Sequence, residues 1–306
     1  SQDSHDYKKI REKLHQKISL YVIPRLNADG AERWTRETAL GIDMNRDAQT
    51  QNSVEARLLS SWADSKRPTF AFNLHDQNRL YSVGNSGHQT HIAFLATAGD
   101  ETGTWTPSRT RAAQLANRLT RLTEKYLPNK VAKWNDEFNP RAFGDTFQSR
   151  GYGLLLLESG GAGWDLEKQS LRRMNAAILL DALVSIADET YVNESTDLYT
   201  QLKTNERQLF DIKITQAALD NSGKNRADIG LNLVETAMPS GEITYSWSIE
   251  EIGDLSYMHA LHVKAGKNWT LAEGSTISLG ANIHELVFKE NETIAFDLRN
   301  FTAEIK

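Results

Sequence analysis

The sequence of 306 residues contains no cysteine and no long apolar run, and it has no excess of positive charge. Without cysteine, the chain cannot form a disulfide framework, a thiolate zinc site or a cysteine nucleophile. No apolar run approaches the roughly 18 residues that a membrane-spanning helix needs, so we predict no transmembrane segment. The net charge of −5 argues against a nucleic acid held through its phosphates. The fingerprints of serine hydrolases, P-loop proteins and dinucleotide-binding proteins do not occur either.

The composition that remains is typical of a globular protein. Hydrophobic residues make up 39% and charged residues 25% of the chain, so a sizeable packed core is expected. The length predicts two domains or one large one. A change in sequence pattern near residue 190 favours two domains, which we place at residues 1–190 and 191–306.

Residues 1–190 alternate between helix-like and strand-like patterns. Apolar residues at helical spacing predict helices at residues 5–17, at about 54–62, at 108–127 and at 165–187. Short runs that are almost entirely apolar predict buried strands at residues 18–23, 69–75 and 153–158. This alternation is typical of an α/β domain with a largely parallel sheet.

Residues 191–306 show a two-residue alternation in place of the helical spacing. Ile243, Tyr245 and Trp247 fall on one face of a predicted strand, and polar residues fall between them. Further strands are expected at residues 277–279, 286–288 and 294–298. We predict a small antiparallel β-sandwich.

Polar residues gather where the predicted strands of the first domain end. One strand ends at His75 and another at Glu158, while Arg36 and Arg46 lie between the first two strands. Ligands of open α/β sheets bind at the carboxyl ends of the strands. A histidine for a metal, a carboxylate as general base and arginines for an anionic substrate suit a hydrolase. Considered alone, His75 is more often a surface residue than a metal ligand, whereas a glutamate ending an all-leucine strand is costly to bury unpaired.

Five short motifs, in this order, resemble the zinc carboxypeptidase family of metallopeptidases, and most closely a bacterial branch of it. They are N-A-D-G-A-E-R, R-x4-G-I-D-M-N-R, F-N-L-H-D-Q, P-R-A-F-G-D and L-L-L-L-E-S-G-G, at residues 27–33, 36–46, 72–77, 140–145 and 154–161. The resemblance covers residues 5 to 190. It implies a three-layer α/β/α domain with a mixed, largely parallel sheet, whose first strands would precede this sequence.

The resemblance also implies roles for single residues in catalysis. His75 would bind one zinc ion, and Glu158 would be the general base that activates water and then protonates the leaving amine. Arg36 would polarise the scissile carbonyl group and stabilise the oxyanion.

Further residues would hold the substrate or support the metal. Asn45 and Arg46 would bind the terminal carboxylate of the substrate, for which the arginine fork is suited. Asp43 would orient a zinc-binding histidine, and Gly144 and Asp145 would lie near the pocket for the terminal side chain.

The sequence departs from the family in two respects. The family takes two more zinc ligands from an H-x-x-E motif before the N-x-D-G segment, but His5 and His15 are followed after three residues by Lys8 and Ile18. Catalytic zinc usually has three protein ligands. We therefore expect that this sequence is the carboxyl-terminal part of a longer protein, that the remaining ligands lie upstream, and that this chain alone does not hold zinc.

The second departure concerns a tyrosine that often closes over the substrate in the family. No tyrosine occurs between residues 126 and 152, so Phe138 or Phe147 is expected to cap the pocket.

The function implied by the resemblance is hydrolysis of a peptide or amide bond next to a free carboxylate, in a peptide or cell-wall peptide. Export to the periplasm or the outside of the cell is implied in the same way. Two alternatives stay open, a deacylase of the aspartoacylase type and a non-catalytic peptide- or glycan-binding protein on a degenerate peptidase scaffold. The natural substrate and the oligomeric state are not indicated by the sequence.

Overall fold

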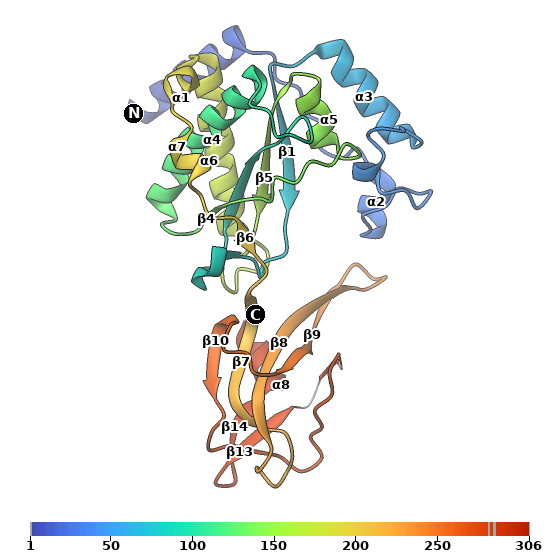
Figure 1. The fold of residues 1–306 in the computed structure, drawn as a ribbon, viewed down its shortest axis with the longest axis vertical. Helices are drawn as coiled ribbons and strands as arrows, with labels where there is room; N and C mark the ends of the chain where they lie inside the picture. The colour runs from blue at the N-terminus through green and yellow to red at the C-terminus, as the bar shows by residue number, and fades with distance from the viewer. Residues whose placement is uncertain (1, 281, 284–285, 306) are drawn as a thin grey trace. The chain divides into compact units, whose positions relative to one another are not determined.

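The computed structural model describes residues 2–280, 282–283 and 286–305, and the chain divides into two compact units (Figure 1). The first unit comprises Ser1–Arg79 and Thr90–Asn205, and the second comprises Leu80–Gln89 and Glu206–Lys306. The fold is mixed α/β with several sheets, and the described strands form no barrel.

The sheet of the first unit has four strands in the order β1-β5-β3-β4. The strands are β1 (Phe70–Asp76), β5 (Gly153–Ser159), β3 (Ile92–Ala96) and β4 (Val131–Lys133). The pairs β1–β5 and β3–β4 are parallel, whereas β3 and β5 are antiparallel. The sheet is therefore mixed, and β1 is one of its edge strands.

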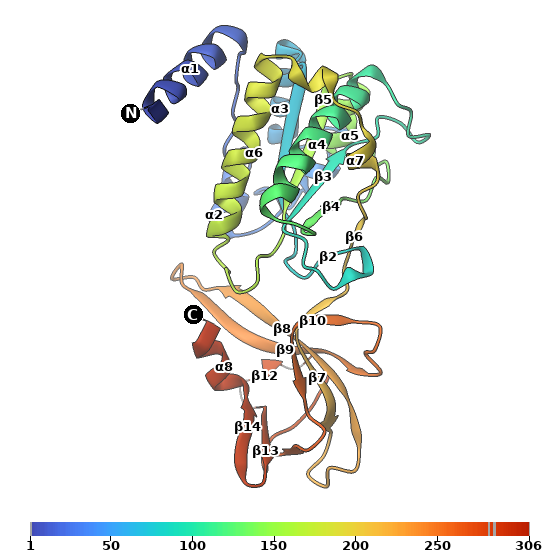
Figure 2. The ribbon, with the colours of Figure 1, turned by 90° about the vertical axis from the view of Figure 1, so that its left-hand side faces the viewer.

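Helices cover both faces of this sheet (Figures 1 and 2). Leu155 and Leu157 of β5 belong to a core cluster with residues of α4 and α6, whereas Leu154 and Leu156 pack with residues of α3 and α5. Successive side chains of a strand point to opposite faces, which explains why β5 is apolar along its length. The helices of this unit are α1 (Gln2–Lys17), α2 (Ala28–Arg33), α3 (Val54–Lys66), α4 (Pro107–Tyr126), α5 (Phe143–Ser149), α6 (Gln169–Ala187) and α7 (Asp197–Thr200).

The helices and strands predicted from apolar spacing are confirmed within a few residues, with one exception in this unit. The predicted strand at residues 18–23 is wrong, because these residues have no regular secondary structure. Leu20, Tyr21 and Val22 are 59%, 49% and 71% exposed. The ring of Tyr21 meets Trp62 edge-on at 5.5 Å between centroids. A strand needs a neighbour for its backbone hydrogen bonds, and among the described residues this segment has none.

The second unit carries a five-stranded and a three-stranded sheet, in the orders β10-β7-β8-β9-β12 and β11-β13-β14. Trp247 is buried in the β8–β9 pair, as the alternating pattern predicted. The elements are β7 (Leu209–Ala218), β8 (Arg226–Ala237), β9 (Ile243–Gly253), β10 (His259–Ala265), β11 (Thr270–Leu271), β12 (Asn282–Ile283), β13 (Val287–Glu290), β14 (Thr293–Asp297) and α8 (Leu298–Ile305), with a small pair of β2 (Ser82–Val83) and β6 (Asn205–Glu206).

Two predictions for this unit are wrong. Residues 277–279 are not a strand. The pairing is not purely antiparallel either, because β10 lies parallel to β7. Throughout the described part of the chain, no helix combines the length and apolarity required to cross a membrane.

Candidate functional site

His75 and Glu158 lie side by side near the carboxyl ends of two neighbouring parallel strands. The register of β1 and β5 pairs His75 with Glu158, and His75 Nδ1 is 4.0 Å from Glu158 Oε1. In parallel strands, paired residues project to the same face of the sheet. The structure therefore brings together two residues that are 83 positions apart in the sequence.

The surroundings of Glu158 disfavour its charge. The side chain is almost fully buried, and this burial, helped by the negative charge of Asp76, raises the pKa of Glu158 to about 7. Lys168 and Arg36 oppose the rise with their positive charges. A carboxyl group with a pKa near neutrality is well suited to proton transfer.

His75 is held in its neutral form. Burial lowers its pKa, and the positive charges of Arg36 and Arg46 lower it further. This lowering of the pKa of His75 disfavours an ion pair with Glu158, although the two groups are only 4.0 Å apart. His75 Nε2 is buried and has no hydrogen-bond partner among the described residues, so its lone pair is available to a ligand. Neutral imidazole is the form that binds metals.

The R-x4-G-I-D-M-N-R motif forms a small network of hydrogen bonds. Arg36 Nε donates to Asp43 Oδ2 at 2.9 Å, and the backbone nitrogen of Asn45 donates to Asp43 Oδ1 at 3.0 Å. The second bond caps a short 3-10 helix, Met44–Arg46. Arg46 Nη1 donates to the backbone oxygen of Asn45 at 2.7 Å. In this structure Asp43 thus orients Arg36 and the backbone of the motif.

The P-R-A-F-G-D motif lies beside this network. Asn45 Oδ1 accepts a hydrogen bond from the backbone nitrogen of Phe143 at 2.9 Å. Asp145 is buried, which raises its pKa to about 6, while the positive charge of Arg46 acts in the opposite direction. Gly144 is also buried, and an added Cβ there would lie 3.4 Å from Leu154. Asn27 of the N-A-D-G-A-E-R motif joins them, because its Nδ2 donates to the backbone oxygens of Arg36 and Glu37 at 3.2 Å and 3.1 Å. All five motifs therefore contribute to one region of the first unit.

Of the two phenylalanines expected to cap a pocket, Phe147 is part of the core. It is buried in the cluster between α3, α5 and the sheet, with its ring edge-on to Phe143 at 5.5 Å. The expected capping role of Phe147 is therefore wrong, because its aromatic ring is used to pack α5 against the sheet. Phe138 is only half-buried.

Two charged residues that act on Glu158 could not be recognised from the sequence motifs. Asp76 forms an ion pair with Lys168, and both charges shift the pKa of Glu158. Asp76 directly follows His75 at the end of β1, a position that could have indicated its role. Lys168 precedes α6 in a left-handed backbone conformation. No feature of the sequence around Lys168 indicates that it lies near Glu158.

A zinc ion needs more ligands than this group offers. No set of three or more His, Cys, Asp or Glu side chains in the described residues is arranged to hold a metal. The orphaned Nε2 of His75 fits the role of one ligand, but catalytic zinc usually has three from protein.

Comparison of the chain with models of protein families, with curated proteins and with solved structures finds no match. The assignment of a function depends on the motifs and on the geometry described above.

Proposed function

We propose that this chain is part of a zinc carboxypeptidase-type hydrolase, which cleaves a peptide or amide bond next to a free carboxylate. The observation that carries the proposal is the pairing of His75 with Glu158 at 4.0 Å. Arg36 and Arg46 lie close enough for their charges to lower the pKa of His75. An imidazole, a carboxyl group of raised pKa and two guanidinium groups in one place are the parts that such a hydrolase requires.

The proposal includes the finer description of the fold. We interpret the first unit as a carboxypeptidase-like α/β/α domain, which agrees with a mixed sheet covered by helices on both faces. We interpret the second unit as a β-sandwich accessory domain built from its five-stranded and three-stranded sheets. Fold likeness alone does not establish an activity, so the proposal depends on the site.

His75 would contribute one zinc ligand, and we propose that the others come from polypeptide outside this sequence. The chemistry that we assign to the chain itself is proton transfer and substrate binding. Glu158, with a pKa of about 7, can accept a proton from the attacking water and deliver it to the leaving nitrogen. Its burial keeps bulk water from competing for that proton.

Arg36, Asn45 and Arg46 would bind the substrate. The hydrogen bond from Arg36 to Asp43 fixes the direction of a guanidinium group that would stabilise the oxyanion. Arg46 would form a charge-assisted pair with the terminal carboxylate of a peptide or cell-wall peptide. Asp145, on whose carboxyl group the positive charge of Arg46 acts, would border the terminal side chain of the substrate.

The test is a Glu158→Gln substitution in a protein that contains the complete zinc site. Gln has nearly the same shape but cannot accept the proton, so turnover should fall by about 10²–10⁴-fold. Zinc content, measured by metal analysis, should stay unchanged. Glu167→Gln, a change of an exposed carboxylate nearby, is the matched control and should keep full activity.

Two results would contradict the proposal. Activity of the Glu158→Gln variant within tenfold of the parent would exclude Glu158 as the general base. A parent protein that neither binds zinc nor shows chelator-sensitive hydrolysis would favour the non-catalytic binding protein.

A further inference from the structure

Three arginines line a hollow at the other end of the sheet from His75 and Glu158. The hollow has a volume of about 590 Å³ and is bordered by Arg67, Arg111 and Arg150. It lies where β1 and β5 begin, because Thr69 and Tyr152, which directly precede these strands, also line it. At about 3.3 Å per strand residue, it is roughly 17 Å from Glu158. It is therefore separate from the proposed catalytic residues.

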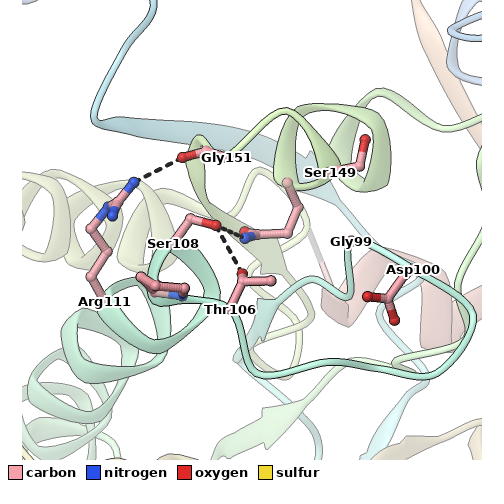
Figure 3. A pocket seen from close by; sticks show the side chains of 9 residues that line it. Gly99, Asp100, Thr106, Ser108, Arg111, Ser149 and Gly151 are labelled. Atoms are coloured by element: carbon pink, nitrogen blue, oxygen red, sulfur yellow. Dashed lines mark hydrogen bonds between the residues drawn. The ribbon is translucent and has the colours of Figure 1, made fainter.

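Arg111 is held in place by uncharged partners. Its Nε donates to the backbone oxygen of Thr69 at 3.2 Å, and its Nη2 donates to the backbone oxygen of Gly151 at 2.8 Å. Figure 3 shows the guanidinium group of Arg111 directed at Gly151. Carbonyl groups fix the plane of a guanidinium without cancelling its charge. Arg111 is therefore positioned in advance for an anion, which lowers the entropic cost of binding.

Arg150 is also positioned, although its charge is partly compensated. Its Nη1 donates to Asp64 Oδ1 at 3.0 Å, and its guanidinium carbon lies 5.8 Å from the centre of the Phe147 ring. Asp64 Oδ1 accepts a second hydrogen bond, from the hydroxyl group of Tyr152 at 3.1 Å. Asp64 is the carboxylate among the residues that line the hollow.

Arg67 supplies a charge that the described residues leave uncompensated. It follows α3 in a left-handed conformation with φ of 45°, and its backbone nitrogen closes the helix by donating to Ala63. Its side chain is exposed, and within the described part of the chain its guanidinium group has no hydrogen bond or ion pair. Three guanidinium groups and one carboxylate give the hollow a formal excess of two positive charges.

The adjoining hollow, shown in Figure 3, differs in its charge. It has a volume of about 330 Å³ and is lined by Asp100 as well as by Arg111. Hydrogen bonds from Thr104 and Thr102 lower the pKa of Asp100 to about 2, so this carboxylate stays ionised. An anion is therefore favoured in the three-arginine hollow and not in its neighbour.

We propose that the hollow between Arg67, Arg111 and Arg150 binds the phosphate group of a small molecule. The three guanidinium groups come from three separate elements, which are the end of α3, the first turns of α4 and the residue after α5. A tetrahedral dianion offers oxygens in several directions to such a set, whereas a planar carboxylate is satisfied by one guanidinium fork. The two negative charges of a phosphate dianion also match the formal excess of two positive charges in the hollow. This proposal does not depend on the hydrolase function.

The test is calorimetric titration of the purified protein with inorganic phosphate and with glycerol phosphate, at an ionic strength held constant with chloride. Succinate serves as the dicarboxylate comparison. We expect saturable binding of phosphate, of its ester or of both, with an affinity at least tenfold higher than for succinate. Arg67→Gln removes one charged donor and should weaken binding by about tenfold. Arg172→Gln, a change of an exposed arginine on α6, should leave binding unchanged.

A second variant keeps the test valid if arginine substitutions disturb the fold. Asp64→Asn removes the competing carboxylate, so it should strengthen phosphate binding. The proposal is overturned if phosphate and glycerol phosphate show no saturable binding, or if succinate binds as tightly as they do. Binding that Arg67→Gln leaves unchanged would overturn it as well.

Discussion

The side-chain oxygen of Asn45 caps helix α5, although 98 positions separate Asn45 from Phe143 in the sequence. The residue before α5, Ala142, has no side chain that could accept a hydrogen bond from the first turn. Asn45 Oδ1 takes over this function by accepting from the backbone nitrogen of Phe143 at 2.9 Å. This single bond joins the motif around Asp43 to the motif around Asp145.

The first prediction concerns the loss of this cap. Asn45→Ala leaves a backbone nitrogen unpaired at Phe143, which is 4% exposed, and it should lower the free energy of unfolding by about 1–3 kcal/mol. Asn45→Asp keeps an acceptor at the positive end of the helix and should recover most of the loss. Urea unfolding measures both effects. Asn135→Ala removes an exposed local bond to Glu137 and serves as control; equal losses in Asn45→Ala and Asn135→Ala would refute the capping role.

The second prediction concerns Asp145 and the pH dependence of stability. Burial raises the pKa of Asp145 to about 6, compared with an ordinary value of about 3.8 in the unfolded chain. Between these pH values the folded protein retains a proton that the unfolded chain has released, so this group lowers stability as the pH rises. Asp145→Asn removes the effect. The variant should therefore be more stable than the wild type at pH 7.5, by up to about 2–3 kcal/mol, and nearly equal to it at pH 3.5.

The measurement for Asp145 is the difference in urea unfolding between variant and wild type across this pH range. Glu137→Gln, an exposed change in the same region, controls for the loss of one negative charge. A difference for Asp145→Asn that stays constant with pH would show that the carboxyl group titrates normally in the folded protein.

Local sequence pattern predicted much of the first unit because its signals are local. The leucine run of β5 is buried on both faces, and Pro107 begins α4 where it was expected. The proximity of His75 and Glu158 could be predicted too, because strand ends meet at one edge of a sheet. The segment at residues 18–23 shows where this reasoning fails. Its apolar pattern indicates β propensity, but a strand also requires a neighbour, and sequence pattern does not show which neighbour is present.

Contacts between distant side chains were the other part that the sequence did not indicate. Nothing in the spacing shows that Lys168 pairs with Asp76, because the backbone turn before α6 determines where Lys168 lies. The same holds for Arg67, Arg111 and Arg150, which meet only because α3, α4 and α5 end or begin at the same end of the sheet. Residues 80–89 likewise group with the second unit, which no local pattern reveals.

The third prediction concerns His91, which precedes β3. Burial lowers its pKa to about 4, and the positive charge of Lys130 contributes to this shift. Between pH 6.5 and pH 4 the unfolded chain binds a proton that the folded protein does not, so stability should be lost as the pH falls through this range. His91→Gln cannot titrate. As the pH falls from 7 to 4, the free energy of unfolding of the variant should therefore rise by about 2–3 kcal/mol relative to that of the wild type.

The measurement for His91 is chemical unfolding at several pH values, expressed as the difference between variant and wild type. A comparison at pH 7 alone reports the packing cost of the substitution, which is separate from the titration. His88→Gln, the same change at an exposed histidine, is the matched control for the substitution itself. If the difference in unfolding free energy between His91→Gln and wild type does not change with pH, His91 is protonated as easily in the folded as in the unfolded chain.

The last prediction concerns Asp47, a buried carboxylate that organises the turn between Arg46 and α3. Its two oxygens accept hydrogen bonds from Thr50, from the backbone and side-chain nitrogens of Asn52, and from the backbone nitrogen and hydroxyl group of Ser53. These bonds lower the pKa of Asp47 to about 2 although burial opposes the shift. Ser53 in turn caps α3.

Asp47→Asn replaces one of these acceptors with an amide that can only donate, so at least one buried donor loses its partner. We expect the free energy of unfolding at pH 7 to fall by about 2–4 kcal/mol. Asp100→Asn is the matched control, since Asp100 accepts similar bonds from Thr102 and Thr104 and has a pKa of about 2 as well, but in an exposed loop where water can replace each lost bond. The loss of unfolding free energy in Asp100→Asn should be clearly smaller than the loss in Asp47→Asn. If both variants lose the same stability, burial adds nothing to the bonds of Asp47, and the turn between Arg46 and α3 is held by other contacts.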